Sequence, residues 1–329
     1  MTEPDVPWAA VPGPEGPGLE GPGPEVPGPA AVPGPAVPGP EGPGLAAWSA
    51  DRLELGEGAR WINNRLYLVD LLAGRLLIAD SVGAPGLREV LRVDQSLGAV
   101  ASRRDHPGTW LLATGTGIAL ADEQGHLEWL GRPEDDNPAS VRMNDGAVDA
   151  HGRFWAGSMA DDGAVGAGSL YRVEHDGTIV RVLDGISIAN GPAFSPDGRL
   201  MYLADSAAGA VDRFTIDEDG DLQSREPFVR FAEGEGSPDG MTVDMDGHLW
   251  LAVWGGGAVH RYRTDGSLER VVPVPATQPT SVCLGGPDGR RLFITSAMVG
   301  LTAPSAMDGA LFSTVADVAG APSLAAVLR

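Results

Sequence analysis

The sequence is almost free of cysteine. Cys283 is the only one in the chain, which excludes an internal disulfide and a cysteine-rich zinc site. Its context, Ser281-Val282-Cys283-Leu284, is typical of a strand, so we expect Cys283 to be a small buried apolar residue. A free thiol is compatible with the cytoplasm, where we expect the protein to reside.

Long apolar runs and common catalytic signatures are also missing. No stretch of about 18 apolar residues occurs, so we expect no transmembrane helix and no membrane partner. The N-terminus has neither a basic start nor an apolar core, so we expect no secretory signal. The sequence contains no serine nucleophile elbow, phosphate loop or dinucleotide fingerprint. Its 6 histidines lack the spacing of a metal site, and we expect them at the surface.

Basic residues are scarce. Lys and Arg together number 23 against 45 Asp and Glu, which gives a formal net charge of −22. A surface this acidic repels phosphate backbones, so nucleic acid is not an expected partner. No feature of the sequence indicates an obligate protein partner.

Residues 1–45 differ in composition from the rest of the chain. They consist largely of Pro and Gly with scattered acids, and they lack the strict glycine triplet of collagen. Pro removes hydrogen-bond donors and Gly is costly to order, so nothing here offsets the entropy of folding. We predict a disordered, solvated tail. The alternative is a ligand for a proline-binding module.

From residue 46 onward the sequence repeats. Asn63–Asp70 resembles Asp246–Val253, and an apolar residue anchors each of six copies about every 45 residues, the period of propeller blades. The anchors are Leu66, Leu111, Phe154, Leu200, Leu249 and Leu292. Asp-Gly pairs between alternating apolar runs indicate hairpins. The sequence therefore predicts an all-β, six-bladed β-propeller over residues 46–329. We expect a strand near Arg52–Leu55 to complete the last blade.

Four short stretches place an oxygen-bearing side chain before a glycine. They are Gly56-Glu57-Gly58, Met143-Asn144-Asp145-Gly146, Ala189-Asn190-Gly191 and Pro238-Asp239-Gly240. Equivalent residues of a closed ring face one another across its axis, so Glu57, Asn190 and Asp239 should meet there. They offer hard oxygen ligands of total charge about minus two, which suit Ca²⁺, Mg²⁺ or Mn²⁺. The alternative is that these pairs are turns. Arg142 precedes Asn144 in the same segment and can hold substrate oxygens.

With these motifs, the chain resembles the senescence-marker-protein-30, gluconolactonase and regucalcin family over roughly Leu55 to Phe312. The resemblance depends on the following segments: Gly56-Glu57-Gly58 with Trp61, Arg142–Asp149, Gly157–Ala160, Ile188–Gly191 and Pro238–Met241. It implies a six-bladed propeller with one divalent metal in the channel and hydrolysis of sugar lactones. Gly58 and Ala59 depart from the family pattern, which more often has Ser-Pro or Gly-Pro after the glutamate.

The resemblance also implies a role for individual residues. The expected metal ligands are Glu57, Asn190 and Asp239, and Asp239 is also the expected general base. The expected substrate-binding residues are Arg142, Asn144 and Asp162. Asp162 falls where regucalcins have a substrate-contacting glutamate, which is one methylene longer. Ca²⁺ is the expected ion, with Mg²⁺, Mn²⁺, Zn²⁺ and Fe²⁺ as alternatives.

We therefore expect a metal-dependent sugar lactonase, a carboxylic-ester hydrolase acting on a small-molecule lactone. In this hypothesis the cation polarises the lactone carbonyl and Asp239 accepts a proton from the attacking water. One alternative is a phosphotriesterase that uses the same metal geometry. The other is a non-catalytic calcium-binding or ligand-sensing propeller.

Overall fold

The structure, a computed structural model, describes residues 44–79 and 86–329. These residues form 24 β-strands and no α-helix. Within the described residues, no helix has the length and apolar character that crossing a bilayer requires. The predicted disordered tail, except for its last two residues, lies outside the described residues.

The strands fall into four ranks by distance from the ring centre. The six inner strands are β2 (Gly56–Ile62), β6 (Leu97–Ser102), β10 (Val141–Val148), β14 (Ala189–Phe194), β18 (Ser237–Val243) and β22 (Pro279–Gly285). The second rank is β3 (Arg65–Asp70), β7 (Trp110–Thr114), β11 (Phe154–Ala160), β15 (Leu200–Asp205), β19 (Leu249–Trp254) and β23 (Arg291–Ser296). The third is β4 (Arg75–Ala79), β8 (Gly117–Ala121), β12 (Gly168–Val173), β16 (Ala210–Ile216), β20 (Ala258–Tyr262) and β24 (Phe312–Val315). The outer rank is β5 (Arg88–Arg92), β9 (Leu127–Gly131), β13 (Ile179–Ile186), β17 (Leu222–Arg230), β21 (Leu268–Pro273) and β1 (Ala46–Ala47).

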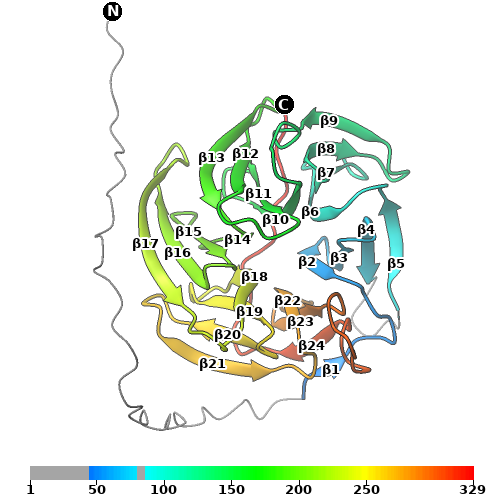
Figure 1. Cartoon of the computed structure of the whole chain (residues 1–329), viewed down its shortest axis with the longest axis vertical. Helices are drawn as coiled ribbons and strands as arrows, with labels where there is room; N and C mark the ends of the chain where they lie inside the picture. Colours follow the sequence, from blue (N-terminus) through cyan, green and yellow to red (C-terminus); the bar gives the residue numbers. More distant parts are fainter. Residues whose placement is uncertain (1–43, 80–85) are drawn as a thin grey trace, which may run out of the picture. The chain divides into compact units, whose positions relative to one another are not determined.

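These strands build six antiparallel sheets of four strands each, arranged as the blades of a ring (Figure 1). We number the blades 1 to 6 from the sheet that begins with β2. All six anchor residues of the sequence repeat lie in the second strands of their blades. The predicted all-β, six-bladed propeller is therefore confirmed.

The ring closes in blade 6, where an N-terminal strand joins C-terminal ones. Ala46 pairs with Ser313 and Ala47 with Phe312, so β1 forms the outer edge of the sheet order β22-β23-β24-β1. The prediction that Arg52–Leu55 supplies this strand was wrong. That segment leads from the blade's outer edge toward the centre, where Leu55 forms a single bridge with Ala297.

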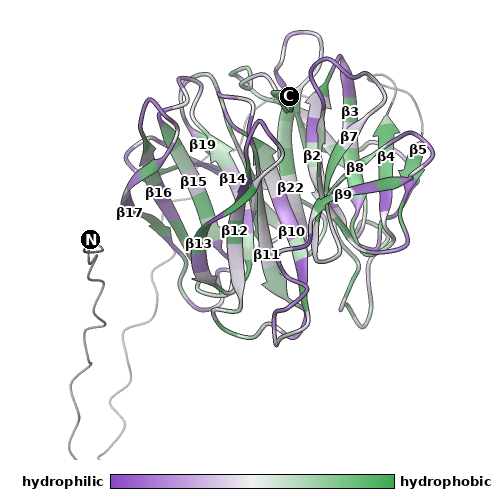
Figure 2. Cartoon of the chain, turned by 90° about the horizontal axis from the view of Figure 1, so that it is seen from above, coloured by the Kyte–Doolittle hydropathy of each residue, from purple (hydrophilic) through white to green (hydrophobic). Residues whose placement is uncertain are grey.

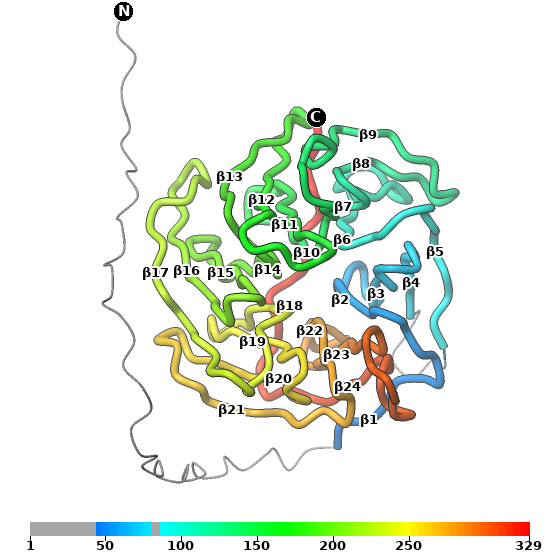
Figure 3. Tube along the Cα trace, viewed as in Figure 1, coloured from blue at the N-terminus to red at the C-terminus, as the bar shows by residue number. Residues whose placement is uncertain are grey.

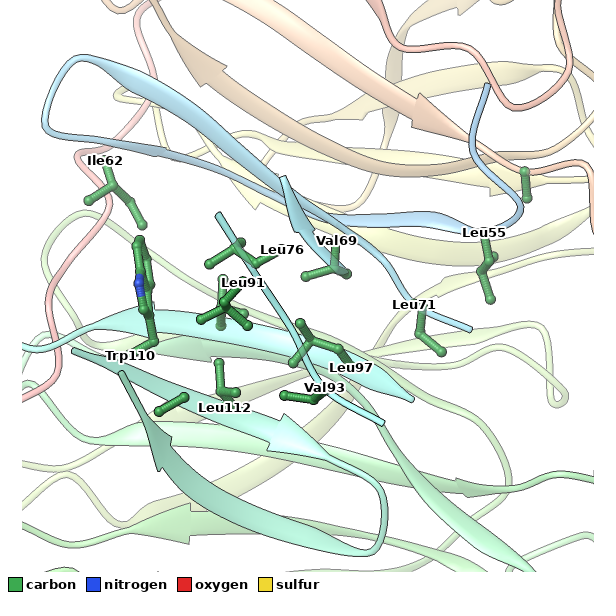
Figure 4. Packing of buried hydrophobic residues seen from close by; sticks show 13 residues of the cluster. Leu55, Ile62, Val69, Leu71, Leu76, Leu91, Val93, Leu97, Trp110 and Leu112 are labelled. Atoms are coloured by element: carbon green, nitrogen blue, oxygen red, sulfur yellow. The ribbon is translucent and has the colours of Figure 1, made fainter. Parts of the chain in front are cut away.

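The core lies between neighbouring blades. Figure 4 shows apolar side chains of blades 1 and 2 meeting face to face, among them Leu76, Leu97, Leu112 and Trp110. The first three are fully buried, and each such side chain contributes about 1.5–3 kcal/mol. The Trp110 ring also lies 4.9 Å from the ring of Tyr67. The strands carry these apolar stretches, while the loops at both ends are mostly hydrophilic (Figure 2).

Every inner strand is interrupted by a register shift against its second strand. The shifts lie between Glu57 and Arg60, Leu97 and Ala99, Met143 and Gly146, Asn190 and Ala193, Pro238 and Met241, and Pro279 and Val282. Each lies close to the start of its strand. A bulge leaves extra residues unpaired and turns their side chains away from the sheet. The six bulges therefore form one layer around the axis, near the end of the channel where the inner strands begin. We call this end the mouth.

The C-terminal segment, residues 316–329, crosses the opposite end of the channel (Figure 3). The backbone N–H of Ala321 donates to the carbonyl of Val243 in blade 5 at 3.3 Å, and that of Ala326 to Ser102 in blade 2 at 2.8 Å. Arg329 reaches blade 3, where its N–H donates to the carbonyl of His175 at 2.7 Å. This strap ties together blades that are distant in sequence and covers the channel end opposite the mouth.

Candidate functional site

A cavity of about 430 Å³ lies at the mouth of the channel. It contains five of the six side chains predicted from the sequence for metal, catalysis or substrate: Glu57, Arg142, Asn144, Asn190 and Asp239. Its other walls are Leu55, Leu72, Met159, Asp161, Ile188, Ser206, Ala207, Ser237, Trp254 and Val299. The predicted residues therefore converge although they come from four different blades.

Glu57 and Asp239 are the two carboxylates of the predicted ligand set, and both are buried, with 6% and 4% of their surface exposed. Glu57 immediately precedes the bulge of β2, and Asp239 lies within that of β18. Each accepts a hydrogen bond from the amide that follows it, Gly58 at 3.3 Å in the first case and Gly240 in the second. Within the part of the chain that the structure describes, neither carboxylate forms a salt bridge.

This environment changes the acidity of both groups. Burial, and then the charge of Asp145, raises the pKa of Glu57 to about 8. Burial, followed by the charges of Glu57 and Asp145, raises the pKa of Asp239 well above its usual range. Removing water disfavours a carboxylate, and neighbouring carboxylates disfavour it further. The mouth therefore holds two carboxyl groups whose ionised forms the protein alone stabilises only in part.

Asn190 is held by a chain of hydrogen bonds that runs across three blades. Its Nδ2 donates to Ser206 Oγ at 2.8 Å, and Ser206 Oγ donates to the carbonyl of Pro238 at 2.6 Å. The serine has one hydroxyl proton, and because Pro238 accepts it, Ser206 must act as acceptor toward Asn190. The Oδ1 of Asn190 consequently faces Asn144, whose Nδ2 donates to it at 3.1 Å. Sequence reasoning missed Ser206, which fixes the amide orientation.

Arg142 lies at the side of the cavity. Its Nη1 donates to Asn144 Oδ1 at 2.7 Å and to the carbonyl of Met143 at 3.1 Å. Its Nε lies 3.6 Å from Asp161 Oδ1. Burial lowers the pKa of Arg142, while the charge of Asp161 raises it. An arginine remains protonated under such shifts, so Arg142 presents a fixed, charged fork beside Asn144.

The structure places Asp162 outside this cavity. Asp162 is exposed, and its Oδ1 accepts a hydrogen bond from the Ala164 amide at 3.0 Å within its own loop. The acid of this loop that lines the cavity is its neighbour Asp161. Asp161 and Ser206 occupy equivalent positions of the repeat, because each directly follows the second strand of its blade. In each case the backbone N–H donates to the carbonyl of the residue just before the inner strand, which is Ser140 for Asp161 and Ile188 for Ser206. Alignment of strand ends would have selected Asp161.

Asp145 is a third buried acid beside the two carboxylates, but it has partners. It accepts hydrogen bonds from the amides of Gly146 at 2.7 Å and Gly191 at 3.0 Å, and Arg60 Nη2 lies at 3.3 Å. Burial raises its pKa, and the Arg60 charge opposes this rise. Because Gly191 follows Asn190, Asp145 holds the backbone beside that residue. The Met143–Gly146 motif contained this residue, but the sequence analysis assigned it no role.

Two small residues allow the inner strands to approach this closely. A side chain on Gly98 would place its Cβ 1.8 Å from the carbonyl oxygen of Asn144. Ala59 is completely buried, and its N–H donates to Ser281 Oγ at 3.3 Å. Proline at residue 59, which resembling proteins often have, lacks that donor. The departure from the family pattern therefore adds a contact between blades 1 and 6.

A second cavity, of about 200 Å³, lies at the strap end of the channel. Its walls are mainly apolar and include Phe194, Met241 and the strap residue Leu324. Among the described residues that line it, Arg60 is the only charged one. The described residues that line this second cavity include no carboxylate, and so they offer no ligands of the kind found at the mouth.

The donor chemistry at the mouth fits a divalent cation. Two buried carboxylates and an oriented amide oxygen supply hard oxygen ligands, and water or substrate can complete the six to eight that Ca²⁺ takes. A cation would also favour the ionised forms of Glu57 and Asp239, which burial and then the neighbouring carboxylates disfavour. No cluster of three or more His, Cys, Asp or Glu suited to a metal occurs in residues 44–79 and 86–329. The fit therefore depends on Asn190 as the third ligand.

Fold and site together define a six-bladed propeller with an acidic, oxygen-lined cavity at one end of its channel. Residues 55–298 match the family model described as "SMP-30/Gluconolactonase/LRE-like region". The chain belongs to this family, and the resemblance drawn from its sequence is confirmed.

Several named relatives align over most of their length. A 6-deoxy-6-sulfogluconolactonase of Pseudomonas putida is 35% identical over 81% of this chain and 92% of its own. The pentonolactonase XacC of Haloferax volcanii is 37% identical over 74% and 81%. Regucalcin of Gallus gallus is 33% identical over 77% and 86%.

Solved structures show the same architecture. A luciferin-regenerating enzyme superposes with a TM-score of 0.80 at 28% identity, over 87% of this chain and 100% of that one. A calcium-binding regucalcin of Agrobacterium tumefaciens gives 0.77 at 29% identity, over 88% and 98%.

Proposed function

We propose that this protein hydrolyses sugar lactones with the help of a divalent cation held by Glu57, Asn190 and Asp239. The observation that carries this proposal is the pair of buried carboxylates, Glu57 and Asp239, which share one cavity and form no salt bridge with any residue the structure describes. Burying charge without compensation is costly, so such a pair is best explained by an external cation.

The relatives support the choice of substrate. They include lactonases of three names: a 6-deoxy-6-sulfogluconolactonase, a pentonolactonase and an L-arabinolactonase of Azospirillum brasilense. Lactonases are carboxylic-ester hydrolases, and these relatives confirm the predicted enzyme class. A small-molecule sugar lactone is the substrate class they have in common.

Ca²⁺ is the ion we expect, because all three donors are oxygen atoms and relatives include regucalcins, one of them titled a calcium-binding protein. Mg²⁺, Mn²⁺, Zn²⁺ and Fe²⁺ are the alternatives. When bound, the cation supplies positive charge for the carbonyl oxygen of the lactone.

The residues of the chain supply the remaining chemistry. Asp239 accepts a proton from water as the water oxygen attacks the carbonyl carbon. The ring C–O bond then breaks, the ring oxygen gains a proton, and the product is the open hydroxy acid. Arg142 and Asn144 hold hydroxyl or ring oxygens, because Arg142 keeps N–H groups beyond those given to Asn144 and Met143.

Purified protein should release acid from aldonolactones, which a pH-stat measures directly. Treatment with a chelator should abolish the activity, and adding back Ca²⁺, Mg²⁺, Mn²⁺ or Zn²⁺ separately should restore it and rank the ions. Turnover that survives complete metal removal would refute the proposal.

The same assay separates the alternative functions. Hydrolysis of a fluorophosphate ester without lactone hydrolysis would indicate a phosphotriesterase. Cation binding by calorimetry with neither activity would indicate a non-catalytic cation-binding propeller.

A further inference from the structure

The charge on the cavity walls bears on which lactones can enter. The chain contains no lysine, and all 23 basic residues are arginines within the described segments. Among the described residues that line the mouth cavity, Arg142 is the only cation. The same walls carry three acids, Glu57, Asp161 and Asp239. These acids outnumber the guanidinium by two charges, which one divalent cation balances.

The charge of Arg142 already has a partner. Its Nε lies 3.6 Å from Asp161, and Asp161 is fixed in turn by the hydroxyl of Ser140, which donates to its Oδ2 at 2.7 Å. The Arg142 side chain is 14% exposed and that of Asp161 50%. Solvent therefore weakens this pair without abolishing it. An anionic substituent near Arg142 has to compete with a carboxylate that is already there.

Arginines on the surrounding loops are also engaged. Arg75 lies 2.6 Å from Asp70, and Arg132 lies 3.3 Å from Asp135. Arg52 donates through Nε to the carbonyl of Ala306 at 2.7 Å. None of these three lines the cavity, so they supply no spare positive charge to a bound ligand.

Much of the remaining wall is apolar. Leu55, Leu72, Trp254 and Val299 line the cavity together with Met159. Such walls contact the C–H faces of a sugar well, but they cannot replace the water around an ionised group. An anionic substituent would lose hydration here, and the only guanidinium on the described walls already has Asp161 as its partner.

We propose that the substrate of this protein is an uncharged aldonolactone, and that lactones bearing a sulfonate, phosphate or carboxylate are rejected. This inference rests on the proposed lactonase function and refines it. The relative named for a sulfonated lactone is 35% identical to this chain, and the proposal separates the two proteins by substrate charge.

The direct test compares kcat/KM for D-glucono-1,5-lactone and its 6-deoxy-6-sulfo derivative with the ion-loaded protein. We expect the neutral lactone to be favoured by about 100-fold, because an ionised group that loses its hydration without gaining a partner costs about 1–3 kcal/mol or more. Raising salt should increase kcat/KM for the anionic lactone and leave that for the neutral one unchanged, because ions screen the repulsion between the anion and a protein of formal net charge −22.

A variant pair tests the role of Asp161. Asp161→Asn frees the charge of Arg142, so the anionic-to-neutral ratio of kcat/KM should rise by about 5- to 10-fold. The matched control is Asp94→Asn, which removes the same charge from an exposed residue outside the cavity lining and should leave the ratio unchanged. Using the ratio cancels any general loss of activity in either variant.

The outcomes are distinguishable. Equal or better hydrolysis of the sulfonated lactone, or no change of the ratio in Asp161→Asn, overturns this inference while the lactonase function stands. Failure to hydrolyse either lactone overturns the proposed function, and the inference falls with it.

Discussion

The two ends of strand β18 hold buried aspartates in opposite situations. Asp239, at the mouth, accepts a hydrogen bond from the Gly240 amide and has no salt bridge among the described residues. Asp244, directly after the strand at the strap end, is completely buried. Four protein groups bond to its carboxylate: the amides of Asp246 and His248, the indole Nε1 of Trp250 and Nε of Arg261, all within 2.8–3.0 Å.

Blade 3 repeats the arrangement at the strap end. Asp149 Oδ2 accepts from Trp155 Nε1 and Arg153 Nε, each at 2.9 Å, and its Oδ1 accepts from the His151 amide. The donors around a buried aspartate therefore decide whether it has a structural or a functional role in this fold. Where the protein supplies all the donors, a buried aspartate holds turns and tryptophans in place. Where it withholds them, the carboxylate remains available to a cation and a substrate.

The largest expected effect comes from Asp239→Asn. The amide cannot accept a proton from water, so lactone turnover should fall by about a thousandfold. The stability of the metal-free protein should stay unchanged or increase, because a buried group with a raised pKa is removed. Steady-state kinetics and thermal unfolding with chelator measure both. Full activity of this variant would eliminate Asp239 as the base.

Asp244→Asn should give the opposite result. Its amide NH₂ would face the donors of Trp250 and Arg261, and Arg261 would lose a buried partner, so unfolding should become easier by about 3–5 kcal/mol. Urea titration measures this, and kcat below the unfolding transition should be nearly unchanged. Asp265→Asn, at an exposed turn of the same blade, is the control and should shift stability by at most about 0.5 kcal/mol. A stability change in Asp244→Asn no larger than that in Asp265→Asn would show that the donors around Asp244 do not stabilise the fold.

Removing the cation should weaken the whole domain. A ligand at 100 times its Kd that binds the folded state alone stabilises by about 2.7 kcal/mol. Chelation should therefore lower the unfolding temperature, and Ca²⁺ titration should raise it again in a concentration-dependent way. In Asp239→Asn the response should be much smaller. An equal response in that variant would place the ion elsewhere.

The metal-free protein should also become less stable as pH rises. The folded-state pKa of Glu57 is about 8, above its ordinary value of 4.5. Between these values the unfolded chain has released the proton and the folded chain retains it. The Glu57 proton should thus lower the free energy of unfolding by up to about 1.4 kcal/mol per pH unit, and this contribution should level off above pH 8. Denaturant titrations at several pH values test this. Glu57→Gln should flatten the slope, and an unchanged slope would assign it to another group.

The smallest expected effect concerns Ser206→Ala. Loss of the hydroxyl leaves Asn190 Nδ2 without its acceptor, so the amide is less well oriented. Cation affinity should fall by about tenfold, the usual effect of removing a group that orients a ligand. Calorimetric titration with Ca²⁺ gives the value. Ser224→Ala, on the exposed outer strand of the same blade, is the control. Unchanged affinity would show that Asn144 alone orients the ligand.

The propeller could be predicted because its blades are local. Apolar anchors such as Leu66 and Leu249 recur at a fixed spacing, and each hairpin is formed by neighbouring segments of sequence. Closure could not be predicted in the same way. The pairing of Ala46 with Ser313 joins distant residues, and two alanines carry no signal that distinguishes them from Arg52–Leu55.

The candidate site was likewise predictable only in part. Convergence of Glu57, Asn190 and Asp239 followed from the repeat, because equivalent residues of a ring share one depth. The repeat did not predict that Asp161, and not Asp162, lines the cavity. A shift of one residue at the end of a strand decides whether a side chain faces the cavity or the solvent.

By itself, the sequence determined the blade period, the oxygen donors and the family, since these depend on residue type and spacing. The tertiary structure alone decided which buried acids have partners. Asp145 and Asp244 look no different from Asp239 in the sequence, yet Arg60, the Gly191 amide, Trp250 and Arg261 neutralise or bond the first two. The physical reason is that the stability of a buried charge depends on groups brought within about 3 Å by packing, and those groups come from other strands and other blades.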